Sequence, residues 1–490
     1  MRKVLAMIAR HHGHMPRRWA PPRRRTGTRR AVLLTSALVL AAGVTAQTTG
    51  DVHIRQFDDG GTYEGSFRDG LKHGQGTYRL PNGFEYTGDW VDGEMTGHGI
   101  ARYPSGAVFE GSFRQGRPHG SGRMTFADGA VHEGAWQDGA MTGEGVLRDA
   151  AGVVYTGGFL DGARHGHGVM EGPGTYRYEG GWDNGAKTGT ARITHADGAT
   201  YEGEILDGVR HGPGILTLAT GEVFEGTWQD GLLEGPGMQR LATGEAYRGM
   251  FRAGMRDGDG VLTLADGTIH EGSFAEDLRH GPGRMTAPDG SSLHGTWIAG
   301  RVDGEARAVY PDGAIHEGVW RDDLPHGPGT LTLADGTVIE AQWQAGAITG
   351  PGTVRFASGA VYEGGLDGGQ KHGHGVLRMP DGASHEGQWR AGRRHGEGTA
   401  RHPDGTVHRG AFRDDLPHGP GVLEAPGGFR YDGTWVEGRM EGTGQLRYAS
   451  GDTYEGGIRD GRRHGPGVLR YATGEVLEGL WEDDAFVAAD

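Results

Sequence analysis

The chain contains the stretch Tyr63-Glu64-Gly65-Ser66-Phe67-Arg68-Asp69-Gly70-Leu71-Lys72-His73-Gly74-Gln75-Gly76, which begins a pattern that continues to the end. Its aromatic-Glu-Gly-x-aromatic motif returns every 23 residues up to residues 477–481, with substitutions but no insertion or deletion, and gives 19 occurrences. We number each period from the first motif residue, so Tyr63 and its equivalents occupy position 1. Self-similarity at this period predicts a repeat architecture in which each unit packs only against its neighbours.

Glycine follows the same period. It accounts for 98 of the 490 residues, about three times the roughly 7% usual in globular proteins. Position 3 is glycine in 18 of the 19 motifs, with Ala341 as the exception, and position 12 is glycine in all 18 intervals. Periodic glycine with 11 Trp, 15 Tyr and 14 Phe excludes a disordered chain. The absence of cysteine excludes disulfides, thiolate metal sites and a cysteine nucleophile.

The turn residues predict β-hairpins. In residues 261–274 two extended runs flank Asp266-Gly267, which predicts a two-residue hairpin loop at positions 20 and 21. Gly174-Thr175 puts the glycine first at this place, which predicts a type II′ turn. Position 8 holds glycine or Asp, residues that tolerate left-handed backbone angles, so a sharp turn is expected there too. The predicted fold is all-β, with about 19 stacked hairpins over residues 52–490.

Positions 1, 3 and 5 point to one face of a strand. A glycine between two rings leaves room for a neighbouring strand's ring to lie on bare backbone. We therefore expect local strain or a bend at Ala341. The alternation of residue types along the repeat is disturbed around Phe251 and Phe274, which predicts a change of twist there.

Every tryptophan after Trp19 occupies position 5. Packing is the favoured interpretation, because aromatic side chains give a thin, glycine-rich unit its core. The alternative is that some of these rings contact a partner, a lipid or a glycan. The candidate contact residues are Trp90, Trp136, Trp182, Trp228, Trp297, Trp320, Trp389 and Trp435.

The first 46 residues predict export. Residues 1–30 form a basic n-region, and residues 31–46 are an uncharged run that ends in small residues, typical of a signal peptide h-region or a signal anchor. Residues 28–34 also resemble a twin-arginine export signal. The alternatives are an organelle transit peptide and a start site placed too early. The predicted localisation is periplasmic or extracellular, with the body either released or anchored to the membrane by residues 31–46.

Charge and spacing exclude several functions. Residues 1–50 hold 10 of the 49 Lys and Arg and none of the 64 Asp and Glu, so the rest of the chain carries a net charge of −25 and is a poor partner for nucleic acid.

Histidine precedes glycine at positions 11 and 12 in ten units. Equivalent histidines are expected about 10 Å apart, too far to share a metal ion, so we expect each of them to bond to the backbone instead. Glu at position 2 predicts a solvated acidic stripe rather than a catalytic pair. We expect no enzyme activity, no cofactor and no metal.

Residues 63–76 closely resemble the MORN repeat (membrane occupation and recognition nexus), and the resemblance extends over residues 52–490. It implies an elongated, twisted antiparallel sheet of stacked hairpins, found in proteins that organise membranes, bind lipids or scaffold other proteins. The sequence departs from the family's commonest form where another residue replaces the leading aromatic, at His132, His270, Leu293, His316, Ile339, His385, His408 and Leu477.

Two functions remain open. The first is a non-enzymatic exported scaffold that mediates protein–protein interaction at the cell envelope. The second is a membrane-associated module that binds lipid or glycan through exposed aromatic residues.

Overall fold

The computed structural model describes residues 52–488. These residues form 39 β-strands and no helix, joined antiparallel in one open sheet. Both findings confirm the predicted all-β fold of stacked hairpins. The described residues divide into two compact units, with the boundary between Met255 and Arg256. The boundary falls between Phe251 and Phe274, where the sequence pattern is disturbed.

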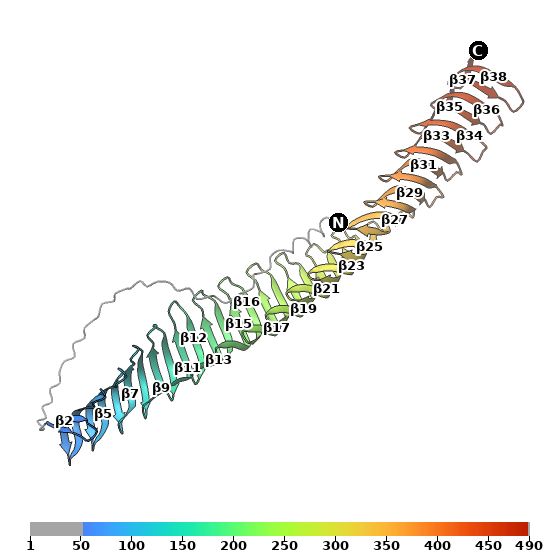
Figure 1. Ribbon diagram of the computed structural model, residues 1–490. Helices are drawn as coiled ribbons and strands as arrows, with labels where there is room; N and C mark the ends of the chain where they lie inside the picture. Colours follow the sequence, from blue (N-terminus) through green and yellow to red (C-terminus); the bar gives the residue numbers. More distant parts are fainter. Residues whose placement is uncertain (1–51, 489–490) are drawn as a thin grey trace. The chain divides into compact units, whose positions relative to one another are not determined.

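In the N-terminal unit each strand pairs with the strands before and after it in the sequence (Figure 1). Strands of seven and nine residues alternate after a short first strand. The strands are β1 His53–Gln56, β2 Thr62–Arg68, β3 Leu71–Arg79, β4 Glu85–Val91, β5 Glu94–Arg102, β6 Val108–Arg114, β7 Arg117–Thr125, β8 Val131–Gln137, β9 Ala140–Arg148, β10 Val154–Leu160, β11 Ala163–Glu171, β12 Arg177–Asp183, β13 Ala186–Thr194, β14 Thr200–Leu206, β15 Val209–Thr217, β16 Val223–Gln229, β17 Leu232–Arg240 and β18 Ala246–Arg252.

The C-terminal unit repeats the same alternation. Its strands are β19 Met255–Thr263, β20 Ile269–Ala275, β21 Leu278–Thr286, β22 Ser292–Ile298, β23 Arg301–Val309, β24 Ile315–Arg321, β25 Leu324–Thr332, β26 Val338–Gln344, β27 Ala347–Arg355, β28 Val361–Asp367, β29 Gln370–Arg378, β30 Ser384–Arg390, β31 Arg393–Arg401, β32 Val407–Arg413, β33 Leu416–Glu424, β34 Arg430–Val436, β35 Arg439–Arg447, β36 Thr453–Arg459, β37 Arg462–Arg470, β38 Val476–Glu482 and β39 Ala485–Ala488.

The tight two-residue turn lies at positions 7 and 8. Arg68 at the end of β2 pairs with Leu71 at the start of β3. Between them Asp69 and Gly70 have φ angles of 50° and 76°, and two successive positive φ angles define a type I′ turn. The turn expected at position 8 is therefore confirmed. Left-handed angles also occur where Asp replaces the glycine, at Asp277, Asp323, Asp415 and Asp484.

The prediction of a two-residue loop at Asp266-Gly267 is wrong. The Leu264 N–H donates to the Thr268 carbonyl at 2.8 Å, and the Gly267 N–H donates to the Leu264 carbonyl at 2.9 Å. Gly267 has a φ of 86°, while Asp266 is not left-handed. The loop therefore has three residues and ends in a left-handed glycine, the common longer hairpin connection.

The type II′ turn predicted at Gly174-Thr175 is also wrong. A type II′ turn has positive φ only at its first central residue. Here Gly174 has a φ of 76° and Thr175 one of 72°. The loop still closes, because the Gly172 N–H donates to the Tyr176 carbonyl at 2.9 Å. A threonine thus adopts the left-handed angle that glycine adopts in the other loops.

Position 12 needs glycine because the backbone is left-handed there in every unit. The φ angles run from 57° at Gly212 to 110° at Gly304. Around Gly74 the strands form a β-bulge. Between the pairs Gly65–Gly76 and Phe67–Lys72, β2 has one residue and β3 has three. A non-glycine residue costs about 1–2 kcal/mol in this conformation, so the bulge accounts for the glycine in all 18 intervals.

The glycines at positions 3 and 14 face each other across neighbouring strands. A Cβ on Gly65 would lie 2.6 Å from the Cα of Gly76, and a Cβ on Gly76 would overlap the ring of Tyr63. A ring does lie on the bare backbone of a neighbouring strand, as the sequence predicted, but that backbone belongs to position 14. The position 3 glycine serves a different need, the close approach of the two strands.

Three of the facing pairs within a unit carry one methyl group. A Cβ added opposite the alanine of a mixed pair would lie 2.5–3.0 Å from the alanine methyl. The mixed pairs are Gly180–Ala191, Gly295–Ala306 and Ala341–Gly352. The strain expected at Ala341 is not found: β26 pairs with β27 from Val338 to Gln344 with the usual register shift, and Ala341 has no positive φ. The bend expected there stays a prediction.

The core is built around the side chains at positions 1 and 5, and apolar side chains at positions 10 and 16 pack beside them. The Tyr63 ring meets Phe67 of its own motif at 5.0 Å and Trp90 of the next at 5.3 Å, both edge to face. The same contact recurs along both units and produces one cluster around residues 63–136 in the N-terminal unit. The C-terminal unit has clusters around residues 285–389 and 431–481. Edge-to-face contacts are worth about 0.5–1.5 kcal/mol each beyond buried area.

Candidate interaction surface

The eight candidate tryptophans all lie in the core. Their exposed fractions run from 1% at Trp297 to 6% at Trp435. This placement fits the packing interpretation, because the rings are not exposed. Contact between these side chains and a partner, lipid or glycan stays a prediction, and it would require the rings to leave their packed positions. The full set is Trp90, Trp136, Trp182, Trp228, Trp297, Trp320, Trp389 and Trp435.

Several of these indoles are fixed by a hydrogen bond across the sheet. The Trp228 Nε1–H donates to the Gly214 carbonyl at 2.9 Å, and Trp90 donates to the Gly76 carbonyl at 3.1 Å. The acceptor is always the position 14 carbonyl of the preceding unit. The buried Nε1 atoms of Trp182 and Trp320 have no hydrogen-bond partner.

Five units bury a histidine at position 1. In each, both ring nitrogens lack a hydrogen-bond partner, whereas a tyrosine at the same position donates its hydroxyl to the position 4 carbonyl, as Tyr155 does to Gly158 at 2.9 Å. Burial lowers the pKa of four of these imidazoles to about 4 and that of His270 to about 3. The histidines are therefore neutral at physiological pH, packed against rings such as Trp136 at 5.4 Å and Phe159 at 4.7 Å. The five are His132, His270, His316, His385 and His408.

Cations at position 10 cover the rings. Position 10 pairs with position 5, so its side chain shares the aromatic face. The Arg164 guanidinium lies 5.1 Å from the centre of the Trp182 ring, and Lys187 Nζ lies 4.7 Å from that of Tyr178. Burial lowers the pKa of Lys187 to about 8, and the charge of Arg164 acts in the same direction. Cation–π contacts of this kind were not predicted from the sequence; a basic residue recurring at position 10 was the available signal.

Some of these cations are neutralised by Asp at position 8 of the following unit. Asp415 Oδ1 accepts from the Arg394 backbone N–H at 3.0 Å and lies 3.4 Å from its Nε. The pair Arg463 and Asp484 has the same geometry, with an Nε–Oδ1 distance of 3.2 Å. The carboxylate thus replaces a turn glycine and balances the charge on the aromatic face.

Two of the ten position 11 histidines accept a backbone hydrogen bond from the next turn, as the sequence predicted, while the buried Nδ1 atoms of four others have no hydrogen-bond partner among the described residues: His119, His165, His395 and His464. The Asp92 backbone N–H donates to His73 Nδ1 at 3.4 Å, and Glu437 donates to His418 in the same way. Glutamates at position 11 do the same with Oε2, as Glu441 does for the Asp460 N–H at 2.9 Å. Within residues 52–488 no three His, Asp or Glu side chains are grouped to hold a metal ion.

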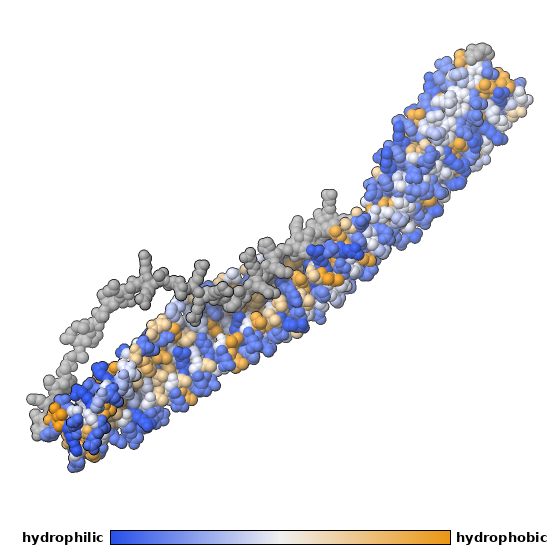
Figure 2. All heavy atoms as spheres, in the orientation of Figure 1, coloured by the Kyte–Doolittle hydropathy of each residue, from blue (hydrophilic) through white to orange (hydrophobic). Residues whose placement is uncertain are grey.

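The opposite face carries the predicted acidic stripe. Glu at position 2 is mostly exposed, and position 15 of the preceding unit stands beside it. Where position 15 is arginine the two form an ion pair, as between Arg307 and Glu317 at 2.9 Å. On the face seen in Figure 2, hydrophilic residues predominate and apolar residues form small groups between them.

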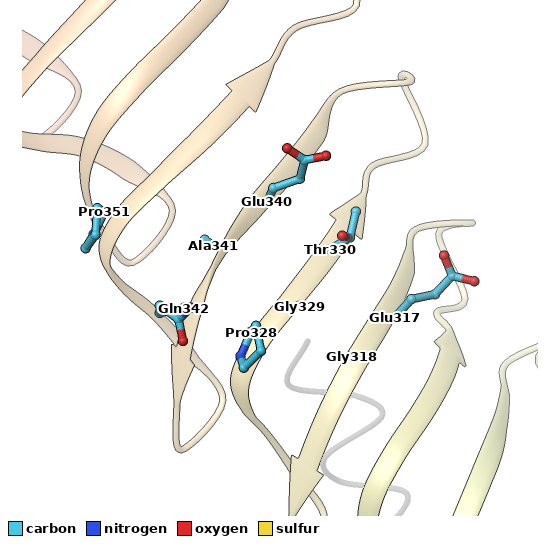
Figure 3. Close-up of a pocket in the computed structure, with 9 residues that line it drawn as sticks. All are labelled: Glu317, Gly318, Pro328, Gly329, Thr330, Glu340, Ala341, Gln342 and Pro351. Carbon is cyan, nitrogen blue, oxygen red and sulfur yellow. The ribbon is translucent and has the colours of Figure 1, made fainter.

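A shallow, open pocket of 440 Å³ lies on this face of the C-terminal unit. Figure 3 shows Glu317 on β24 and Glu340 on β26 on either side of Thr330 on β25, with Pro328 and Gln342 further along the strands. Glu317 is already paired with Arg307. The pocket contains no buried polar group aimed into it, and its chemistry is that of the repeating outer surface.

The fold and surface define a β-hairpin repeat protein with an aromatic core, one face lined by cations over rings and one mixed-charge face. The MORN repeat family matches most of the chain in 17 segments. These are residues 63–84, 86–108, 109–131, 132–154, 155–177, 178–200, 201–223, 224–245, 247–269, 270–292, 316–338, 340–361, 362–384, 385–407, 408–430, 431–453 and 454–476.

The chain belongs to the MORN repeat family. MORN repeats are generally non-catalytic and form scaffolds for protein or membrane interaction. The matches omit the unit that begins at Leu293, one of the departures from the commonest motif, yet β22 and β23 pair there in the same register as elsewhere.

Similar proteins share only parts of the chain. Alsin of Rattus norvegicus and of Homo sapiens is 40% identical over 60 residues, which is 11% of this chain and 4% of the relative. The TCP10 domain of Danio rerio CPAP in complex with a peptide of STIL aligns with 49% of this chain and 91% of that one, at 15% identity and a TM-score of 0.23. The Drosophila melanogaster SAS-4 TCP domain in complex with a proline-rich motif of Ana2 covers 36% and 89%, at 16% identity and a TM-score of 0.22.

Residues 1–46, on which the export prediction rests, lie outside the described residues. In residues 52–488 no helix is long and apolar enough to cross a bilayer.

Proposed function

We propose that this protein is a non-enzymatic, exported scaffold that binds protein partners at the cell envelope. The observation that carries the proposal is the regular lattice of side chains: each 23-residue unit presents the same positions on each face, about 10 Å from the equivalent positions of the next unit. A lattice of this kind suits an extended binding surface, whereas a catalytic centre is a single unsymmetrical group of residues.

Export is supported by the basic and uncharged segments of residues 1–46. N-terminal sequencing of the protein recovered from envelope and extracellular fractions tests this part. A chain that begins near Gln47 supports a cleaved signal peptide, and an intact N-terminus in the membrane fraction supports an anchor. Recovery from the cytoplasm with residues 1–46 intact contradicts the proposal.

Partner binding is tested by photo-crosslinking of the full chain in its native cells. A photoreactive amino acid replaces exposed Thr156 on the acidic face or half-buried Met170 on the aromatic face. We expect an adduct with the same partner protein, stronger from one of the two positions. Equal labelling of abundant proteins from both positions contradicts a specific scaffold.

Lipid or glycan binding is the second candidate, and the family assignment favours it because MORN repeats also occur at membranes. Two observations weigh against it: the candidate tryptophans are buried, and the net charge of −25 on residues 51–490 repels anionic lipid. Co-sedimentation of the full chain with protein-free vesicles of envelope lipids distinguishes the two. Pelleting at physiological salt supports the lipid function, and a soluble protein supports the scaffold.

A further inference from the structure

Three consecutive units place a cation at position 10: Arg164 on β11, Lys187 on β13 and Arg210 on β15. We call these residues the cation row. All three side chains are half-buried on the aromatic face of the N-terminal unit. They lie over aromatic rings, with Arg164 at 5.1 Å and Lys187 at 5.7 Å from the Trp182 ring and Arg210 at 4.5 Å from the Trp228 ring.

The cation row lacks the carboxylates that balance some of the other position 10 cations. None of its members forms an ion pair within residues 52–488, whereas Arg394 and Arg463 are paired with Asp at position 8 of the next unit. In the cation row that position 8 residue is Gly185, Gly208 or Gly231. Arg210 donates instead to the Gly231 carbonyl at 3.0 Å, and Lys187 Nζ donates to the Tyr176 hydroxyl at 2.6 Å.

Uncompensated positive charge in a partly desolvated setting is unfavourable, and Arg164 acts on Lys187 as a like charge. An anionic occupant would relieve it. The three cations are half-buried, and the net charge of −25 on residues 51–490 opposes the approach of a flat anionic membrane. A narrow, flexible polymer with spaced carboxylates fits better than a surface.

The spacing identifies the conformation of such a polymer. Successive members of the row are two strands apart, about 9.6 Å at the usual strand separation of about 4.8 Å. A polyproline II helix has three residues per turn and a rise of about 3.1 Å, so every third side chain returns to the same face after about 9.3 Å. A β-strand cannot match this pattern, because residues three apart in a strand point to opposite faces.

We propose that the cation row binds an acidic segment of a partner protein in polyproline II conformation, with a carboxylate at every third residue. The carboxylates would pair with Arg164, Lys187 and Arg210, and the residues between them would contact half-buried Tyr176 beside Lys187. The proposal rests on the scaffold function above and names the site and the chemistry of one partner.

Fluorescence anisotropy with the full chain tests the pairing. The probes are two fluorescein-labelled heptapeptides of the same composition, Glu-Pro-Pro-Glu-Pro-Pro-Glu and Glu-Glu-Glu-Pro-Pro-Pro-Pro. We expect the first to bind at least tenfold more tightly in low-salt buffer, with the difference reduced by added salt. Equal affinity for the two peptides would overturn the proposed spacing.

Two variants test the site. Lys187→Gln removes the central charge. Gly208→Asp puts a carboxylate beside Lys187 in the place that Asp415 occupies beside Arg394, and the turn accepts it, because a Cβ at Gly208 meets no atom within 4 Å and Asp415 has a similar φ of 74°. Each variant should weaken binding of the first peptide about tenfold. The matched control Arg394→Gln, whose cation is already paired, should leave binding unchanged.

Unchanged binding in both variants would overturn the proposal. Binding of phosphatidylserine vesicles that depends on Lys187, without peptide binding, would also overturn it and assign the row to lipid. Failure here is separable from failure of the scaffold function: photo-crosslinked adducts that persist in Lys187→Gln would retain the scaffold and reject this site.

Discussion

Replacement of the five position 1 histidines by tyrosine should remove a large part of the protein's sensitivity to acid. The substitution fits the structure, because tyrosine occupies the same position in other units, with its hydroxyl bonded to the position 4 carbonyl. Tyr155 and His132 have the same register, opposite Met170 and Leu147 respectively. The variant carries His132→Tyr, His270→Tyr, His316→Tyr, His385→Tyr and His408→Tyr.

The magnitude follows from the lowered pKa values. In the unfolded chain a histidine has a pKa of about 6.5, while burial holds the folded value near 4 for His132. Below pH 6.5 these histidines become protonated in the unfolded chain but stay neutral in the folded protein. Protonation therefore favours the unfolded state, and the free energy of unfolding, constant above pH 6.5, decreases between pH 6.5 and about 4. From pH 7.5 to pH 5.0 each histidine lowers the free energy of unfolding by about 2 kcal/mol, and five independent sites lower it by about 10 kcal/mol.

Urea unfolding of the full chain at pH 7.5 and 5.0, followed by far-UV circular dichroism, measures the effect. The wild-type midpoint should fall steeply between the two pH values, and the tyrosine variant should lose much less. The control replaces three exposed position 13 histidines by tyrosine, His98, His167 and His374, and should behave like the wild type. The reasoning would be refuted if the five-tyrosine variant lost as much stability as the wild type.

Three further outcomes are expected. Gly74→Ala should destabilise its unit by about 1–2 kcal/mol because of the left-handed φ of 73°, measured as faster hydrogen exchange in β2 and β3. Trp228→Phe should lower the free energy of unfolding in urea by about 1 kcal/mol more than Trp320→Phe, because of the two indoles only that of Trp228 donates a hydrogen bond. Equal losses of stability would show that the hydrogen bond contributes nothing. Asp415→Gly should lower stability by about 1 kcal/mol or less, with a loss that shrinks at high salt.

The repeat period, the fold class and the aromatic core could be predicted from the sequence, since they depend on spacing alone. The turn assignment could not. Each unit contains two turn-forming pairs, such as Asp69-Gly70 and Asn82-Gly83 in the first unit, and both suit a tight hairpin by local chemistry. The choice between them depends on which residues pair across the strands, a property of the whole unit.

The cation row was missed for a related reason. Lysine and arginine usually lie in solvent, and position 10 holds cations in some units and apolar residues such as Met95 and Val302 in others, with no regular order. Burial of Arg164 and Lys187 over aromatic rings becomes visible only when position 10 is known to pair with position 5. The sequence did contain a clue, because Asp replaces the turn glycine beside Arg394 and Arg463, which places a negative charge where no turn requires one.

The facing pairs at positions 3 and 14 restrict how this chain can change over time. Gly180–Ala191 carries its methyl on one strand, and Ala341–Gly352 carries it on the other. A lineage that moves the methyl across a pair must first lose it, since two alanines would clash. The order of the two mutations therefore decides whether the intermediate folds. A pair with two glycines is the intermediate through which a unit can move its methyl group from one strand to the other.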